Sequence, residues 1–177
     1  ENAAISRRLA ELVRNSDDIG ARQTQVNEHL AQLTERMRGI RQQLGIAGFS
    51  DAIGPVLLEE RRNLPDVRQY QRSARERQQS IVRARLAQFQ TEEQLRQVRA
   101  VEDNLKELAA KFDPQWSDAQ RQAAIAELRP LLVERQQLLE KLSAGYSNLT
   151  TGLVALDEAQ RKLIDQAELY GTLLDRH

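Results

Sequence analysis

The sequence predicts an all-α protein, and its composition and apolar periodicity both indicate this class. Only 4% of the 177 residues are aromatic, with 8 Gly and 4 Pro, a composition that disfavours sheets and turn-rich folds. Apolar residues recur at alternating steps of three and four, as in helices that pack lengthwise on other helices. We therefore expect an elongated antiparallel three-helix coiled-coil bundle with a short extra helix at one tip, forming a single elongated helical domain of residues 1–177.

The longest apolar stripe predicts a helix over residues 117–176. Ser117 and Gln120 have the spacing of a capping box at its start, and Pro130 should kink the helix near Glu127 unless the helix breaks there. The stripe is Ile125, Leu128, Leu132, Arg135, Leu139, Leu142, Tyr146, Leu149, Leu153, Leu156, Gln160, Leu163, Ala167, Tyr170 and Leu174. A second rank widens it: Leu131, Leu138, Val154, Ile164 and Leu173. More than one helix must pack on so wide a stripe.

The N-terminal part of the chain predicts one long and one short helix. A helix over 2–44 carries the stripe Ile5, Leu9, Leu12, Ser16, Ile19, Gln23, Val26, Leu30, Leu33, Met37, Ile40 and Leu44. Gly45 is placed to end it as a left-handed residue. A glycine-rich loop follows, and Ser50 is a candidate cap for a short helix over 50–63, which Leu64-Pro65-Asp66 should end.

A further long helix is predicted over 66–112, beginning near Asp66 and ended by Asp113-Pro114. Its apolar face is Val67, Tyr70, Ala74, Ile81, Ala84, Leu95, Val98, Leu105, Ala109 and Phe112. Val82, Leu86, Phe89 and Leu108 should lie beside that face, and the polar residues Arg77, Gln88, Thr91 and Glu102 interrupt it. Three long helices joined by short breaks can only fold back on one another.

Overall charge and cysteine content exclude several classes of protein. The 26 basic and 26 acidic residues cancel, so no global field attracts nucleic acid or anionic lipid. No apolar run is long enough to span a membrane, and residues 1–30 lack the charged, apolar and small-residue blocks of a signal peptide. The absence of cysteine excludes a disulfide framework and cysteine zinc sites.

No residues form a catalytic, cofactor-binding or metal-binding pattern, so we expect neither an enzyme nor a cofactor. His29 and His177 are the only histidines and are far apart in the sequence. The carboxylate pairs Glu59-Glu60 and Glu92-Glu93 are adjacent, so the members of each pair should point apart into solvent. Glu92 with Arg96, and Asp157 with Arg161, have the four-residue spacing of helix-stabilising ion pairs.

Arginine is concentrated in the middle of the chain, and this has two interpretations. Residues 61–99 contain ten arginines against four acidic residues, an excess of six positive charges. Arg68, Arg72 and Arg75 share one helix face and could bind phosphates. Alternatively, this helix packs between two acidic ones, which we favour because no aromatic residues alternate with the arginines to stack on bases. We expect neither a nucleic acid nor a small-molecule substrate as partner.

Several short motifs resemble one family. They are Ser50-Asp-Ala-Ile-Gly54, Glu60-Arg-Arg-Asn-Leu-Pro-Asp66, Arg83-Ala-Arg-Leu-Ala-Gln-Phe89, Leu128-Arg-Pro-Leu-Leu132 and Gly145-Tyr-Ser-Asn-Leu149. Together they resemble the N-terminal periplasmic region of the large bacterial mechanosensitive channels related to the small-conductance channel. The resemblance covers essentially the whole chain, and the Ser-Asp-Ala-Ile-Gly and Leu-Pro-Asp elements are its most specific parts.

The resemblance implies a periplasmic domain of a bacterial inner-membrane channel that opens under membrane tension in hypo-osmotic shock. The domain would act as a spacer, assembly surface or modulator, with the transmembrane remainder of the same chain and neighbouring channel subunits as partners in a homo-oligomer. The apolar pattern is already running near Glu1 and unfinished at His177, so we expect a fragment of a longer membrane protein. A soluble coiled-coil scaffold or adaptor is the alternative.

Overall fold

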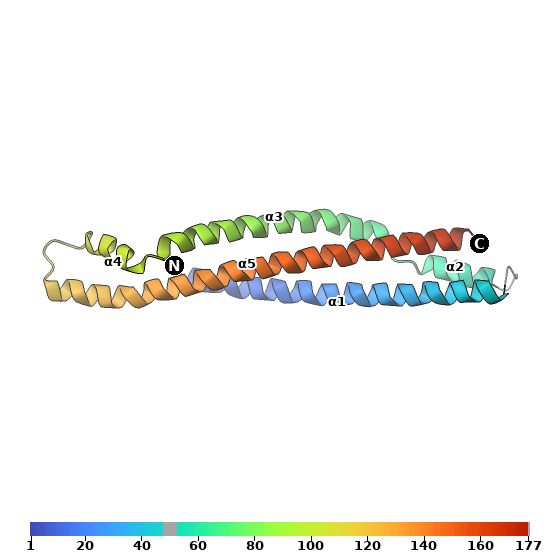
Figure 1. The fold of residues 1–177 in the computed structure, drawn as a ribbon, viewed down its shortest axis with the longest axis horizontal. Helices are drawn as coiled ribbons and strands as arrows, with labels where there is room; N and C mark the ends of the chain where they lie inside the picture. The colour runs from blue at the N-terminus through green and yellow to red at the C-terminus, as the bar shows by residue number, and fades with distance from the viewer. Residues whose placement is uncertain (48–52, 177) are drawn as a thin grey trace. The chain divides into compact units, whose positions relative to one another are not determined.

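The computed structural model describes residues 1–47 and 53–176, and its regular structure there is helical, without a β-strand. The helices are α1 (Asn2–Ala47), α2 (Gly54–Arg62), α3 (Val67–Val98), α4 (Val101–Ala109) and α5 (Asp118–Asp175), shown in Figure 1. The predicted all-α class is confirmed. None of these helices is both long and apolar enough to cross a membrane.

Contacts divide the chain into two compact units. Unit one consists of residues 1–17 and 82–150, and unit two consists of residues 18–81 and 151–177. Helices α1, α3 and α5 each contribute a segment to both units. The expectation of a single domain over residues 1–177 stays a prediction, because a division of contacts does not test whether the units fold separately.

Unit one is built around an apolar core from three helices. The core residues are Ile5 and Leu12 of α1, Leu95 and Val98 of α3, and Leu139 and Leu142 of α5. Asn2 Nδ2 donates to the Glu134 carboxylate over 2.9 Å at the start of α1. Further along, Leu12 lies against Gly145, so within this unit α1 and α5 run in the same direction.

Unit two has a second apolar core between α1, α2 and α5. It contains Val26, Leu33, Met37, Ile40, Leu57, Leu156, Ala159, Leu163, Ala167, Tyr170 and Leu174, and partly buried residues such as Val67 and Tyr70 of α3 pack against it. α2 carries Leu57 and lies beside the C-terminal end of α1 (Figure 1).

The predicted apolar stripe of the last helix is confirmed as a buried or partly buried face of α5 from Leu139 onward. In the second rank, however, Leu131 is 53% exposed.

Short polar side chains cap the starts of both α3 and α5. Asp66 Oδ1 accepts from the Arg68 backbone N–H over 3.0 Å, so a short polar side chain begins α3 after the break at Pro65. At the start of α5, Ser117 N–H donates to Gln120 Oε1 over 2.8 Å, and Gln120 N–H donates to Ser117 Oγ over 3.3 Å. This reciprocal pair is the predicted capping box.

Several helix boundaries differ from the prediction. Gly45 does not end the first helix, because α1 continues to Ala47 and Gly45 has no left-handed backbone conformation. The predicted cap at Ser50 lies outside the described residues. The second helix begins at Gly54, where Pro55 in its first turn needs no backbone donor. Within α5, the helix runs unbroken through Pro130, so the predicted alternative of a break there is excluded.

The predicted helix over 66–112 is two helices, α3 and α4, separated at residues 99–100. Ala100 has φ −86° and ψ 65°, which is not a helical conformation. A helix that stops at Val98 leaves its last carbonyl groups without helical partners. The Asn104 side-chain amide donates to one of them, the Gln97 carbonyl, over 2.8 Å. One of these carbonyl groups thus has a partner across the break, and Leu105 of α4 is buried.

Candidate functional site

A polar cluster at one end of unit two joins three helices. Glu60 of α2 accepts at Oε2 from Arg36 Nη2 over 2.6 Å, from Arg36 Nε over 2.9 Å and from the Tyr170 hydroxyl over 2.8 Å. The Tyr170 side chain is fully buried, and this burial, together with the hydrogen bond to Glu60, raises the pKa of its phenol far above the ordinary value. The phenol therefore stays a neutral donor.

Glu60 was expected to be a solvated carboxylate, and this expectation is wrong. Its side chain is only 21% exposed and paired with Arg36, whose side chain is 34% exposed. A signal for this was present in the sequence, because Tyr170 lies on the apolar stripe and a buried tyrosine hydroxyl usually needs a partner. What sequence periodicity could not give is which carboxylate the fold brings to that position.

A second buried polar site lies between α3 and α5 in unit two. Asp157 Oδ1 accepts from Arg77 Nε over 3.2 Å and from Arg77 Nη2 over 3.1 Å. The Arg77 side chain is 8% exposed and the Asp157 side chain is 6% exposed. The predicted pair of Asp157 with Arg161 is confirmed at 2.8 Å, and Gln78 Nε2 adds a weaker contact at 3.3 Å. Asp157 is thus a buried anion held by two guanidinium groups, rather than a surface residue.

A polar hollow of about 310 Å³ lies between α1 and α3 in unit two. Gln160 of α5 is only 8% exposed in its lining, and its Oε1 atom has no hydrogen-bond partner among the described residues. His29 and Ser73 also line the hollow, but Ser73 Oγ donates to the Gln69 carbonyl over 3.0 Å. The hydroxyl is therefore engaged with the backbone instead of an imidazole base, so this hollow offers hydrogen bonds and not an activated nucleophile.

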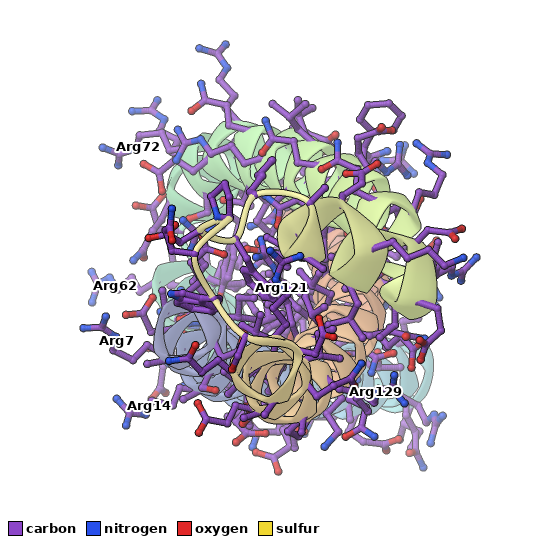
Figure 2. The ribbon with its side chains drawn as sticks, turned by 90° about the vertical axis from the view of Figure 1, so that its left-hand side faces the viewer. Arg7, Arg14, Arg62, Arg72, Arg121 and Arg129 are labelled. Carbon is purple, nitrogen blue, oxygen red and sulfur yellow. The ribbon has the colours of Figure 1, made fainter. Side chains whose placement is uncertain are left out.

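The arginine-rich helix α3 contains exposed arginines without a carboxylate partner in the described part of the chain and also a buried arginine that is paired with one. These correspond to the two interpretations that the sequence left open. Arg68, Arg72 and Arg75 are exposed and, with Gln71, line an open hollow of about 490 Å³. Figure 2 shows Arg72 directed away from the helices. Among the described residues, none of these three arginines forms an ion pair with a carboxylate. Arg77, from the same helix, is instead neutralised in the interior by Asp157.

The histidines and the Glu92–Glu93 carboxylates do not come together in one site among the described residues. His29 is exposed on α1, as expected for a surface residue, and His177 lies outside the described part of the chain. Glu92 is half-buried and accepts at Oε1 from Gln88 Nε2 over 2.9 Å and from Ser143 Oγ over 3.4 Å. Its predicted partner Arg96 pairs with Glu93 instead. Within residues 1–47 and 53–176, no three His, Asp or Glu side chains gather as metal ligands.

Comparisons with protein-family models and with curated proteins found no match to this chain. The specific motifs of the resemblance are only partly within the described residues. Gly54 begins α2, and Leu64, Pro65 and Asp66 form the turn into α3, whereas residues 50–52 lie outside the described ranges. The geometry therefore gives a helical protein with internally paired buried charges, and the resemblance to the channel family rests on the sequence motifs alone.

Proposed function

We propose that the chain is a periplasmic spacer, assembly or modulatory domain of a bacterial inner-membrane mechanosensitive channel, without catalytic activity of its own. The observation that carries the proposal is the Ser-Asp-Ala-Ile-Gly54 and Leu64-Pro65-Asp66 pattern, which flanks α2. Its partners would be the transmembrane remainder of the same chain and neighbouring subunits of a homo-oligomer.

For the fold, we propose an elongated antiparallel three-helix coiled coil with α2 as the short extra helix at one tip. The order of contacts within each unit supports this arrangement. In unit two, Gly152 of α5 lies against Ile19 and Gln166 lies against Met37, so α1 and α5 run in the same direction. In unit one, Arg129 of α5 pairs with Glu102, and Ser143 bonds to Glu92, so α3 and α4 run opposite to α5.

Contacts of α2 fit a role in bearing or transmitting load. In unit two, Glu60 bonds to α1 through Arg36 and to α5 through Tyr170, while Arg61 pairs with Asp175 near the end of α5 over 2.9 Å. The Tyr170 and Arg36 contacts are charge-assisted hydrogen bonds in a partly buried place, where they resist separation better than exposed pairs do. A short helix bound in this way holds the ends of two long helices together.

The location can be tested by cysteine labelling, because the chain has no cysteine of its own. We would replace the exposed Arg72 with Cys in the intact gene product and treat whole bacteria with a maleimide that does not cross the inner membrane. The proposal expects labelling of intact cells and recovery of the protein with the membrane fraction. Labelling only after lysis, with the protein in the soluble fraction, would favour the scaffold or adaptor alternative.

The channel role needs a functional test as well. Deleting residues 1–177 from the intact protein should leave a tension-gated conductance in membrane patches but change its threshold or its adaptation. Survival of cells after hypo-osmotic shock is the accompanying readout. A gene product without any conductance, with or without these residues, would contradict the proposal.

A further inference from the structure

Helix α3 carries an exposed apolar stripe in unit one. Val82, Leu86 and Phe89 are 64%, 57% and 60% exposed, and they follow one another at steps of four and three residues. At about 100° per residue, Leu86 lies nearly opposite the buried Ala84 and Ile81 face of the same helix. The sequence pattern predicts these three residues beside the buried face, whereas in the structure they are exposed to solvent.

This stripe has the spacing of a coiled-coil seam. Steps of four and three keep apolar residues on the side of a helix that faces one partner helix. Phe89 is one of three phenylalanines in the chain, and it is exposed together with two aliphatic residues on the same line of the helix, so the three form an apolar patch. The arrangement fits a second helix laid along α3.

The edge of the stripe carries opposite charges. Arg85 precedes Leu86, is exposed, and makes no hydrogen bond or ion pair with another described residue. Glu92 lies seven residues later on the same edge of the helix, and the two hydrogen bonds it accepts from Gln88 and Ser143 both go to Oε1. When two copies of this helix edge lie antiparallel, the cation of each copy comes near the anion of the other.

We propose that this face of α3 binds the same face of a second copy of the chain, with the two helices antiparallel. When Leu86 lies opposite the partner's Phe89, the two-fold symmetry also sets Phe89 opposite the partner's Leu86. In this register Arg85 comes next to the partner's Glu92, and the symmetry repeats the pair. The same contact thus pairs Arg85 with a carboxylate and buries the apolar stripe.

A parallel pairing is disfavoured by charges on the same line of the helix. Glu93 and Arg96 continue the stripe toward the end of α3, at the next steps of four and three. In a parallel pair each would face its own copy, and like charges directly opposite destabilise such a contact. In the antiparallel register Glu93 lies opposite the partner's Val82 instead, and no like charges meet.

Three apolar side chains from each copy make a small interface, so the association should be weak. Stable complexes bury roughly 1,600 Å² in total, more than this stripe offers by itself. We expect a monomer–dimer equilibrium with a dissociation constant on the order of 100 μM, which a flexible covalent tether between the copies would strengthen. The pairing does not depend on the proposed channel role, because it is measured on this chain alone.

Sedimentation equilibrium of the chain over about 10 to 500 μM tests the association. Leu86→Asp should abolish it, and Arg85→Glu should weaken it several-fold by placing two carboxylates together. Val13→Asp, at a 53% exposed position of α1 in the same unit, is the matched control and should dimerise like the wild type. Circular dichroism checks that all variants are folded. A monomer at every concentration, or a dimer that tolerates Leu86→Asp, would overturn the proposal.

Single cysteines test the register, since the chain contains none. A mixture of Leu86→Cys and Phe89→Cys chains should form the mixed disulfide faster under mild oxidation than either chain forms a disulfide with itself. A parallel pair would give the opposite preference. Predominant disulfides between identical positions would therefore refute the antiparallel arrangement.

Discussion

Asp157 has an environment that its neighbours in sequence do not suggest. Its i+4 partner Arg161 is exposed and was predictable, whereas Arg77 reaches it from another helix. A buried carboxylate without its cation is costly, because desolvation is no longer offset by attraction. A displacement of α3 along α5 within unit two that separated these two groups would leave a buried charge without its partner.

Removing one partner of this pair should destabilise the fold strongly. Arg77→Met leaves the exposed Arg161 as the only cation paired with Asp157, and we expect a loss of about 3–5 kcal/mol in the free energy of unfolding. The double variant Arg77→Met with Asp157→Leu should recover most of that loss. Urea denaturation of the four forms gives the coupling energy as a double-mutant cycle.

Arg161→Ala is the control for this pair, because its side chain is 67% exposed and the loss should be below about 1 kcal/mol. Similar losses for Arg161→Ala and Arg77→Met would mean that burial does not matter at this site. A double variant as unstable as the single one would point to a packing defect instead.

Tyr170 predicts a pH dependence in the alkaline range. The folded chain holds the phenolic proton after the unfolded chain, with a pKa of about 10, has lost it, because burial and Glu60 raise the folded pKa. The contribution of Tyr170 is thus complete below pH 10 and declines as pH rises. We expect wild type to lose up to about 1.4 kcal/mol per pH unit more than Tyr170→Phe above pH 10.

The readout is urea denaturation of both proteins at several pH values between about 8 and 11.5. At neutral pH the Tyr170→Phe variant should be about 1 kcal/mol less stable, since one hydrogen bond to a carboxylate is lost while Glu60 keeps Arg36. Parallel pH profiles for the two proteins would contradict the raised pKa.

At the scale of the element, periodicity predicted the buried face of each long helix but not every flank. The α1 stripe from Ile5 to Leu44 lies inward, and the same holds for Leu139 to Leu174 of α5. Val82, Leu86 and Phe89 were misplaced because the interior of α3 accepts polar side chains such as Arg77 and Thr91, both buried. Because the buried face of α3 includes arginine and threonine, its edges are not marked by hydrophobicity, and apolar residues outside it are easily assigned to it.

The break between α3 and α4 could not be predicted for a different reason. Neither Gly nor Pro lies near Arg99 and Ala100, and the residues that end the helix act through a side chain that comes later in the sequence, Asn104. Caps at Asp66 and Ser117 were predictable because their partners lie within three residues. The local signals at Asp66 and Ser117 agree with the structure, whereas Gly45 was misread as a helix end, and the contact of Asn104 with Gln97 depends on the folded chain.

Two helix glycines should respond oppositely to replacement by alanine. Gly39 of α1 has open space around it, so Gly39→Ala should stabilise the protein by about 0.5–1 kcal/mol through reduced backbone entropy of the unfolded chain. A methyl group at Gly145 of α5 would lie 2.5 Å from Leu12 Cδ2, inside the unit-one core where Leu12 is 4% exposed. Gly145→Ala should therefore lose about 1–2 kcal/mol despite its better helix propensity.

Thermal or urea denaturation of the two variants checks this contrast. Gly145→Ala combined with Leu12→Val, which shortens the clashing side chain, should be closer to wild type than Gly145→Ala alone. If Gly145→Ala stabilised the protein as much as Gly39→Ala, the close approach of α1 and α5 in unit one would be incorrect.

At the scale of the whole molecule, the fold class followed from composition and period, whereas the candidate sites did not. Low aromatic content and long apolar stripes leave a chain little choice except long helices. The polar groups that give this protein individuality, such as Glu60 with Tyr170 and Arg77 with Asp157, each join positions about 80 or more residues apart in the sequence. Which residues pair over that distance depends on the register of one helix against another. A heptad pattern is compatible with several registers, because it repeats every seven residues.

The proposed elongated coiled coil makes a prediction about size in solution. Helix α5 alone has 58 residues, which at about 1.5 Å per residue makes it roughly 87 Å long. A globular protein of 177 residues would have a radius of gyration of about 16 Å, and a rod as long as α5 would have one of about 25 Å. Small-angle scattering at low concentration, extrapolated to exclude dimers, should give the larger value with a long tail in the pair-distance distribution. A radius near 16 Å would require α5 to be broken in solution. The break would be expected at Pro130, because proline cannot donate a backbone hydrogen bond and Pro130 is the one proline in this helix.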